Sequence, residues 1–226
     1  MPNHIVNRIT ADFNLEKFIG KAGDRKTFDF NQFIPMPKCL VRDGCPMNVE
    51  MIAEITLGLI DLGAPKQMPS NPMEDMGAAV SAMHQGNAIR LLQESKMAKD
   101  LSDEHFELLI AMIRSYRECG SLNWHDWSHK NWGTKWNAYD VEVVSPSVVT
   151  FQTAWDNPRP VIDVLATAIG SLKHEWADED WGNNVGWVEY KGGEIVSGEN
   201  LGGTPAGLAL AYELHNVDPN DLDDDE

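Results

Sequence analysis

Apolar and polar residues alternate in several short stretches of the chain, and a two-residue period is typical of β-strands. HIVNRIT, near the N-terminus, predicts a first strand at about 5–11. Two stretches rich in β-branched residues, at about 138–144 and 148–153, predict a further pair. KHEWADED and VGWVEYKGGEIVSG predict the last strands, and Gly192 and Gly193 favour a hairpin turn inside the second stretch.

Elsewhere, apolar residues recur three or four positions apart, which predicts amphipathic helices. Two of these helices span about 48–62 and 73–99. A third begins after Ser102, whose hydroxyl can cap it, and ends at Gly120. VIDVLATAIGSL predicts another helix, and a short one follows from Thr204 to about Leu214.

The N-terminal stretch predicts a strand–helix–strand unit. After the first strand, LEKFIGKAG predicts a short helix that is capped by Asp12 or Asn14 and ended by Gly23. KTFDFNQFIPMP then places Phe28 and Phe30 on alternate positions, as in a second strand that is stopped by prolines.

The same strand–helix–strand order returns in the C-terminal half. Two such units on either side of a helical insertion predict an α+β protein with a ferredoxin-like antiparallel sandwich, whose helices cover one face of the sheet. We expect this domain to comprise residues 1–37 and 123–217. Residues 38–122 are the expected helical insertion, and residues 218–226 the expected acidic, mobile tail.

Tryptophan is concentrated in one part of the chain. All eight tryptophans lie between Trp124 and Trp187. Each buried indole removes a large apolar area from water and needs an acceptor for its N–H, so a dense cluster marks either a packed centre or an exposed binding face. Strand-like alternation favours Trp132 and Trp136 facing inward, with Lys135 facing outward.

Charge narrows the classes of function. The chain has 35 Asp and Glu residues against 18 Lys and Arg residues, a formal net charge of −17. This balance argues against ordinary nucleic-acid binding, which depends on basic side chains that neutralise phosphates. An acidic surface favours solubility, and it can also attract a basic protein. Both interpretations stay open.

Cellular location and cofactors follow from what the sequence lacks. It has no run of about eighteen apolar residues and no secretory signal. Cys39, Cys45 and Cys119 form no CxxC pair, so we expect free thiols in a reducing cytoplasm, without membrane contact. Since no nucleotide-binding glycine motif or nucleophile elbow is present, we expect no cofactor and assign no catalytic residue.

Two groups of side chains could carry chemistry. His125 and His129 are four residues apart, which on a helix places both imidazoles on one face, as a zinc pair requires. HDWSH has no glutamate at the HExxH position, however, and no obvious third ligand. Glu175, Asp178 and Asp180 are close carboxylates that could hold a cation or act as general acid and base. On a strand, Glu175 would face away from the other two.

A third group interleaves basic and aromatic residues. Trp132, Lys135 and Trp136 could stack on and neutralise a single-stranded nucleic acid. Two lysines in this region are few for a chain of such negative charge, so nucleic acid remains an unlikely partner. The binding-site candidates are therefore Trp132, Lys135, Trp136, Glu175, Asp178 and Asp180.

Six phrases of the sequence form a recognisable set: MPNHIVNRIT, FDFNQFIPMP, NWGTKWNAYD, TAWDNPRPVIDVLA, HEWADEDWGNNVGWVEYKGGE and LALAYELHNVDP. Together they resemble the YubB-like family of plasmid and bacteriophage proteins. The resemblance covers about 1–37 and 132–219 and leaves out the insertion. It implies a ferredoxin-like domain and an accessory protein of a mobile element that acts in a bacterial cytoplasm. It implies no catalytic residues.

We therefore expect a non-enzymatic accessory protein that binds a host protein through its acidic surface or its insertion. Inhibition of a host defence system, of restriction or CRISPR type, is suggested by analogy alone. The alternatives are a metal-dependent enzyme that acts on nucleic acid, using His125, His129 or the carboxylates between Glu175 and Asp180, and a single-stranded nucleic-acid binder. The sequence identifies neither the partner nor the oligomeric state.

Overall fold

A computed structural model describes residues 3–42, 44, 46–58, 101–180 and 182–218. The chain divides into two compact units. One comprises Met1–Met36 with His125–Glu226, and the other comprises Pro37–Trp124. The expected helix at 73–99 and most of the acidic tail lie outside the described residues.

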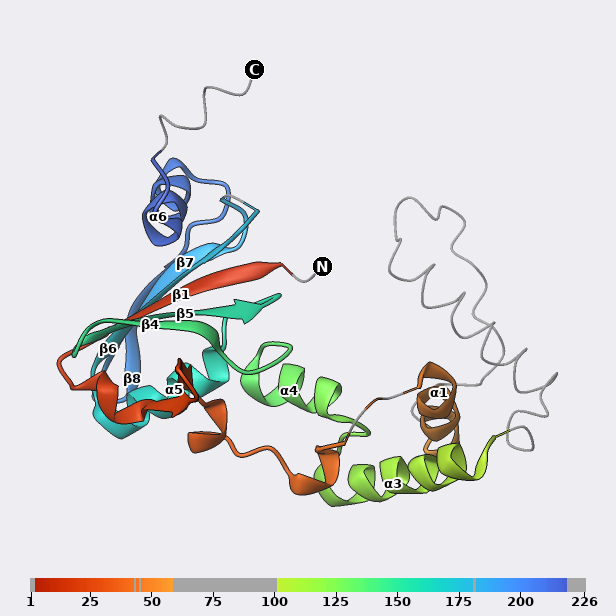
Figure 1. Ribbon diagram of the computed structural model, residues 1–226. Helices are drawn as coiled ribbons and strands as arrows, with labels where there is room; N and C mark the ends of the chain where they lie inside the picture. Colours follow the sequence, from red (N-terminus) through yellow and green to blue (C-terminus); the bar gives the residue numbers. More distant parts are fainter. Residues whose placement is uncertain (1–2, 43, 45, 59–100, 181, 219–226) are drawn as a thin grey trace, which may run out of the picture. The chain divides into compact units, whose positions relative to one another are not determined.

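The first unit is built on a six-stranded antiparallel sheet with the strand order β4-β5-β1-β6-β7-β8 (Figure 1). The sheet has β1 near its middle, where Ile5 lies opposite Thr153 on one side and opposite Asp178 on the other. The strands are β1 His4–Ala11, β4 Tyr139–Ser145, β5 Val148–Ala154, β6 Leu172–Asp178, β7 Val185–Lys191 and β8 Glu194–Asn200.

Two helices complete a ferredoxin-like domain. Helix α4, Trp124–Trp132, precedes β4, and helix α5, Arg159–Ile169, connects β5 to β6. The order β1-α4-β4-β5-α5-β6, with β5 and β1 in the middle of those four strands, is the split βαβ arrangement. The expected α+β class, with a ferredoxin-like antiparallel sheet and a helical insertion, is confirmed. β7 and β8 extend this sheet beyond β6, and they meet at the predicted glycine turn.

The N-terminal strand–helix–strand unit was wrongly predicted. Leu15–Phe18 is a single 3₁₀ turn, and Asn14 caps it by accepting the N–H of Glu16 at 3.0 Å. The strands that follow, β2 Ile19–Ala22 and β3 Arg25–Phe28, pair only with each other, as a separate hairpin. A tight turn at Gly23 and Asp24 lets these short strands pair locally, so the second strand contacts β4 without joining the hydrogen-bonded ladder of the main sheet. The helix of the first βαβ unit is α4, which lies after the insertion.

The hairpin and the two helices cover one face of the sheet with aromatic and aliphatic side chains. The ring of Phe28 lies 5.1 Å from that of Phe151 on β5, and the ring of Phe30 lies 5.7 Å from that of Trp132 on α4. From α5, Val161, Ile162, Leu165 and Ala166 are buried. Burial of these side chains is the main stabilisation of this face.

The opposite face has a helix of its own, contrary to the expectation that helices cover one face only. Helix α6, Pro205–His215, is capped by Thr204 as predicted, and it packs on β6 and β7 (Figure 1). Its cluster contains Ala177, Val185, Leu201 and Ala211. The short side chains on β6 and β7 leave room for a helix there, a feature that the strand pattern alone does not reveal.

The second unit contains a short 3₁₀ helix, η3 Lys38–Leu40, with α1 Met47–Thr56 and α3 Asp103–Cys119. The caps of α3 are as predicted: Ser102 Oγ accepts the N–H of His105 at 3.2 Å, and Gly120 ends the helix in the left-handed conformation. Helix α1 ends earlier than expected, at Thr56. The buried cluster of this unit comprises Val49, Ile52, Ala53, Leu109, Met112 and Leu122.

A chain of hydrogen bonds crosses the core of the first unit. His174 on β6 is completely buried, and its Nε2 lies 3.0 Å from Asn7 Oδ1 on β1. Asn7 Nδ2 donates to Thr153 Oγ1 on β5 at 2.9 Å, and Thr153 Oγ1 donates to the carbonyl of Asp156 at 2.8 Å. The amide oxygen of Asn7 can only accept, so the proton of His174 is on Nε2. Its Nδ1 is buried without a partner.

Protonation of His174 should make the protein less stable in mild acid. Burial, with the nearby charge of Arg159, lowers the pKa of His174 from 6.5 to about 3. The unfolded chain binds this proton and the folded chain does not, so stability is retained above about pH 6.5 and falls as the pH decreases. Between pH 6.5 and 5, this proton should lower the free energy of unfolding of the wild type by about 2 kcal/mol. His174→Gln should lack this part of the decrease. Urea unfolding of both proteins at each pH measures this, and parallel curves would contradict it.

Close packing of α6 gives a second prediction. A Cβ added at Gly207 would lie 2.2 Å from the carbonyl oxygen of Leu201 and 2.9 Å from Val185 Cγ1. We therefore expect Gly207→Ala to lower the free energy of unfolding by about 1–3 kcal/mol, although alanine favours helix. Ala209→Gly, at an exposed position of the same helix, measures the helix propensity alone. An increase in stability for Gly207→Ala in denaturant melts would show that α6 is not packed so closely.

Candidate functional site

The end of β5 carries an exposed tryptophan in an unusual backbone conformation. Trp155 has a φ of 75°, and 41% of its surface is exposed to solvent. The left-handed region costs a bulky L-residue roughly 1–2 kcal/mol, so neighbouring contacts must hold it. The N–H of Trp155 donates to the carbonyl of Asn3 at 2.9 Å, and Thr153 Oγ1 bonds to the carbonyl of Asp156 on its other side.

The segment that follows α4 is fastened to the same strand end. Thr134 Oγ1 donates to the carbonyl of Ala154 at 2.7 Å, and Ser128 Oγ of α4 donates to the carbonyl of Lys135 at 2.6 Å. Gly133, at φ 81°, permits this close approach, because a Cβ there would lie 2.9 Å from Pro160 Cδ. Residues of α4, of this segment and of β5 are thereby brought to one place.

Five side chains meet there, and we call them the Trp155 cluster: His125, His129, Lys135, Trp136 and Trp155. The imidazole of His129 stacks on the indole of Trp155, with ring centroids 5.0 Å apart and planes at 20°. His125 lies 4.7 Å from His129 and 5.6 Å from Trp155. The ammonium of Lys135 lies 4.7 Å and 4.3 Å from the ring centroids of Trp136 and Trp155. These distances suit cation–π attraction.

The electrostatics of the cluster favour a neutral His129. Burial lowers the pKa of His129, and the charges of His125 and Lys135 lower it further, while Asp126 acts in the opposite direction. His129 Nε2 is buried without a hydrogen-bond partner. A neutral imidazole that stacks on an indole is an apolar support, so the cluster holds Trp155 in place.

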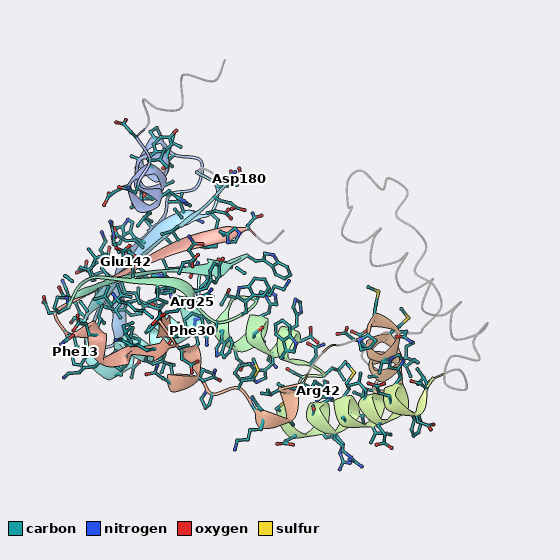
Figure 2. The ribbon with its side chains drawn as sticks, in the orientation of Figure 1. Phe13, Arg25, Phe30, Arg42, Glu142 and Asp180 are labelled. Carbon is teal, nitrogen blue, oxygen red and sulfur yellow. The ribbon has the colours of Figure 1, made fainter. Side chains whose placement is uncertain are left out.

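Exposed carboxylates lie on the segments that meet at this end of the sheet. Asp156 follows it directly in the chain, and Asp126 lies next to His125, with 3.7 Å between Asp126 Oδ1 and His125 Nδ1. The N–H of Glu179 donates to the carbonyl of His4, which directly follows Asn3, the residue that accepts the N–H of Trp155. Asp180 lies in the loop that follows β6 (Figure 2). We call the four exposed residues the acidic rim: Asp126, Asp156, Glu179 and Asp180.

The candidates predicted from the sequence are only partly brought together. Lys135 and Trp136 lie in the Trp155 cluster with His125 and His129, which share one face of α4 as their spacing predicted. Trp132 is apart from them. It lies on α4, not on a strand as expected, is 4% exposed, and its indole N–H donates to the carbonyl of Ile34 at 2.9 Å.

The three carboxylates have separate roles. Glu175, buried on the α6 side of the sheet, accepts from Arg8 Nε at 2.8 Å and from Lys173 Nζ at 2.6 Å. Burial opposes ionisation, but these hydrogen bonds outweigh it and lower the pKa of Glu175. Asp178 Oδ1 accepts the N–H of Asp180 at 2.9 Å. Asp178 and Asp180 therefore lie together, and Glu175 belongs to an ion-pair network elsewhere. Among the described residues, no three Asp, Glu, His or Cys side chains are arranged to hold a metal ion.

Trp155 itself was not among the predicted site residues. The signal available was its position between the strand SVVTFQTA and the turn-forming DNP. A tryptophan at such a boundary can emerge from the core at the strand end, whereas one inside a strand takes its direction from the alternation.

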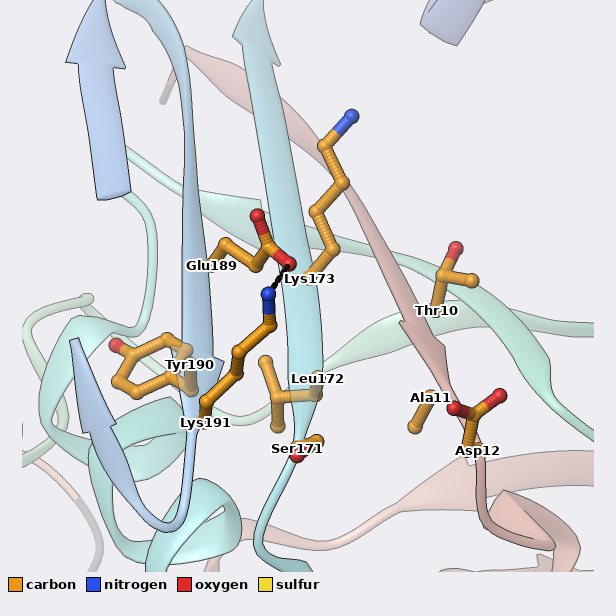
Figure 3. A pocket seen from close by; sticks show the side chains of 9 residues that line it. All are labelled: Thr10, Ala11, Asp12, Ser171, Leu172, Lys173, Glu189, Tyr190 and Lys191. Atoms are coloured by element: carbon orange, nitrogen blue, oxygen red, sulfur yellow. Dashed lines mark ion pairs between the residues drawn. The ribbon is translucent and has the colours of Figure 1, made fainter. Parts of the chain in front are cut away.

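A charged hollow near the other end of the sheet has no tryptophan in its lining. It measures about 400 Å³ and is lined by residues of β1, β6 and β7 (Figure 3). Lys191 and Glu189 on its wall pair with each other at 3.3 Å, and Lys173 is engaged with Glu175. The charges of these three lining residues are thus satisfied within the protein, which makes the hollow a weaker candidate than the Trp155 cluster.

Comparisons with known proteins agree with the fold. Residues 131–204 match a family model described as "Ferredoxin-like domain in Api92-like protein". The match runs from the end of α4 through β8, so this part of the chain is similar to the ferredoxin-like domain of Api92-like proteins. No curated protein matches the sequence.

A crystal structure of the protein api92 from Yersinia pseudotuberculosis is similar at 10% sequence identity and a TM-score of 0.35. The alignment covers 91% of this chain and 100% of that chain.

Within the described part of this chain, no helix has both the length and the apolar character needed to cross a membrane.

The arrangement of the cluster predicts opposite effects of two substitutions on His129. Lys135→Met removes a positive charge and keeps the apolar stem, so we expect the pKa of His129 to rise toward its ordinary value. Asp126→Asn removes a negative charge and should lower that pKa further. Titration of the His129 ring protons by NMR measures both. Shifts of the same sign, or none, would show that these charges do not act on His129 as described.

Proposed function

We propose that the protein is a non-enzymatic binding protein whose Trp155 cluster and acidic rim dock a basic host protein. The observation that carries this proposal is the exposed indole of Trp155, held in place at the end of the sheet where the acidic rim also lies. Residues that dominate protein interfaces are enriched in tryptophan and lie within a rim of weaker polar contacts. The two features together suit a partner that presents an apolar or aromatic pocket surrounded by lysine and arginine.

Rigidity supports this role. Hydrogen bonds to the backbone on both sides of Trp155, together with the stacked His129 and the ammonium of Lys135, restrict the indole before any partner arrives. A side chain that is already ordered loses little conformational entropy on binding, so more of its contact energy appears as affinity. The strained backbone at Trp155 also fits a functional position, since strain persists only where surrounding contacts impose it.

Charge supports the choice of a basic partner. The net charge of −17 gives the whole chain a long-range attraction for cationic surfaces, and the rim adds exposed carboxylates at the same end of the sheet as Trp155. Complementary charge raises association rates and selects among partners more than it raises affinity. Binding should therefore weaken with salt, and the Trp155 contact should persist at salt concentrations that screen the rim.

The class of host partner follows from the sequence resemblance. Similarity to the YubB-like family of plasmid and phage proteins implies an accessory protein of a mobile element. Enzymes of bacterial defence, of restriction or CRISPR type, have basic surfaces because they bind nucleic acid. An acidic protein from a mobile element could occupy such a surface, and we propose inhibition of a defence enzyme as the biological outcome.

Single-stranded nucleic acid fits this surface less well. A base would have to stack on Trp136 or Trp155, yet Lys135 lies against both rings and His129 is stacked on Trp155. The nearby carboxylates would also repel the phosphates. Protein binding therefore explains more of the geometry than nucleic-acid binding does.

Differential capture tests the proposal. The wild-type chain and the variants Trp155→Ala and Asp156→Asn/Asp180→Asn are immobilised and exposed to bacterial lysate at low and moderate salt. We expect wild type to retain a basic protein that Trp155→Ala retains at least about tenfold less, the loss of a strong interface residue. The double variant should lose it mainly at low salt. Recovered proteins are quantified by mass spectrometry.

A matched control distinguishes the loss of the rim carboxylates from a general loss of negative charge. Glu16→Gln/Glu194→Gln removes two exposed carboxylates with the same change of net charge, one from the turn after β1 and one from the start of β8, at the end of the sheet opposite to the rim. This variant should capture the partner as wild type does. Equal losses for the two charge variants would show that overall charge is responsible. Absence of any protein above background at both salt concentrations would refute the proposal.

A further inference from the structure

Two cysteines lie at the two ends of the helical unit. Cys39 is on η3, where the chain enters this unit, and Cys119 is the last residue of α3, just before the chain leaves it. Figure 1 shows η3 beside the C-terminal end of α3, and these two elements are in contact. The free cysteines at the two ends are therefore brought to one place, although eighty positions separate them in the sequence.

Ser115 connects the two cysteines. Its Oγ lies 3.1 Å from the carbonyl oxygen of Cys39, and Cys119 Sγ, one helical turn further along α3, donates to the carbonyl of Ser115 at 3.2 Å. Arg42, labelled in Figure 2 at this end of α3, holds the arrangement by donating from one guanidinium nitrogen to both Cys39 O and Ser115 Oγ. Ser115 is completely buried, so this contact is a fixed part of the packing.

The thiols themselves interact. Burial raises the pKa of the Cys39 thiol, a hydrogen bond with Ser115 opposes this, and the neighbouring Cys119 thiol, also within hydrogen-bonding reach, raises it again. Both cysteines are partly exposed, so a small oxidant can reach them. Two adjacent thiols with access to solvent are the arrangement from which a disulfide forms with little movement of the backbone.

We propose that Cys39 and Cys119 are an oxidation site, which hydrogen peroxide converts to a reversible intramolecular disulfide. Peroxide transfers one oxygen to one sulfur, giving a sulfenic acid and a first molecule of water. The second thiol attacks that sulfur, the S–S bond forms, and the hydroxyl group leaves with the thiol proton as a second molecule of water. Two electrons pass from the two sulfurs to the peroxide. A dithiol reductant returns both cysteines to thiols.

The disulfide would join the two ends of the helical unit. It closes a loop of about 80 residues, a length for which cross-linking restricts the unfolded chain strongly. In the reducing cytoplasm the pair stays open. Oxidative conditions would therefore link η3 covalently to the C-terminal end of α3. The Trp155 cluster, which lies in the other unit, would not be altered.

Peptide mapping of the full-length chain tests the site. Reduced protein carries three thiols, and treatment with a small excess of hydrogen peroxide should leave one. Trypsin should then release Cys39–Arg42 linked to Glu118–Lys130, lighter by two hydrogens than the sum of the two free peptides. Dithiothreitol should restore both peptides and all three thiols.

Single substitutions identify the pair. The Cys45→Ser variant has two thiols when reduced, and treatment with hydrogen peroxide should leave none. The Cys39→Ser variant should retain both of its thiols under the same treatment. Oxidation should also raise the midpoint of thermal unfolding in Cys45→Ser by roughly 5 °C or more, with no rise in Cys39→Ser. A linked peptide that contains Cys45, a disulfide between two chains on a non-reducing gel, oxidation to sulfinic acid without a link, or an unchanged thiol count would overturn the proposal.

Discussion

Asn7, in the middle of β1, forms hydrogen bonds with the strands on both of its sides. It accepts from His174 on β6 and donates to Thr153 on β5, and all three residues are completely buried. Buried polar groups are costly unless they are paired, so any slip of one strand by a residue would leave several of them without partners. The register of the three central strands, and the path of the chain at the end of β5, follow from this constraint. Thr153 extends it to the carbonyl of Asp156, across the turn that contains Trp155.

The charges of the first unit fall into two populations with different consequences. Glu175 is buried, and it is paired with the partly exposed side chains of Arg8 and Lys173 on neighbouring positions of the sheet. The acidic rim is exposed at one end of the sheet, where its charges act mainly on what approaches from solution. Net charge alone does not distinguish these populations. Their separation is what gives the Trp155 cluster an electrostatic surrounding suited to a basic partner.

Local patterns in the sequence predicted local structure well, and long-range arrangement less so. β5, α5, α6 and the caps of α3 follow from alternation, helical spacing and capping residues, which act over a few residues. The strand–helix–strand unit at the N-terminus failed because LEKFIGKAG was expected to be a helix, whereas its second half, Ile19–Ala22, is the strand β2, which a tight turn at Gly23 pairs with β3. The spacing of His125 and His129 predicted their proximity. Their contact with Trp155 depends on the tertiary approach of α4 to the end of β5, for which one sequence contains no direct signal.

The wide separation of β1 from its partners affects how the protein is made. The residues opposite Ile5 are Thr153 and Asp178, so during synthesis β1 leaves the ribosome on the order of ten seconds before either neighbour exists. Throughout that time its apolar side chains, Ile5 and Ile9, and both of its backbone edges lack their native contacts. Non-local pairing of this kind slows folding and exposes nascent chains to aggregation. The separately packed helical unit is complete before β5 is translated, so it would be the first part to fold. The ferredoxin-like sheet must then assemble around a strand that was synthesised early and remained unpaired, a situation in which chaperones assist.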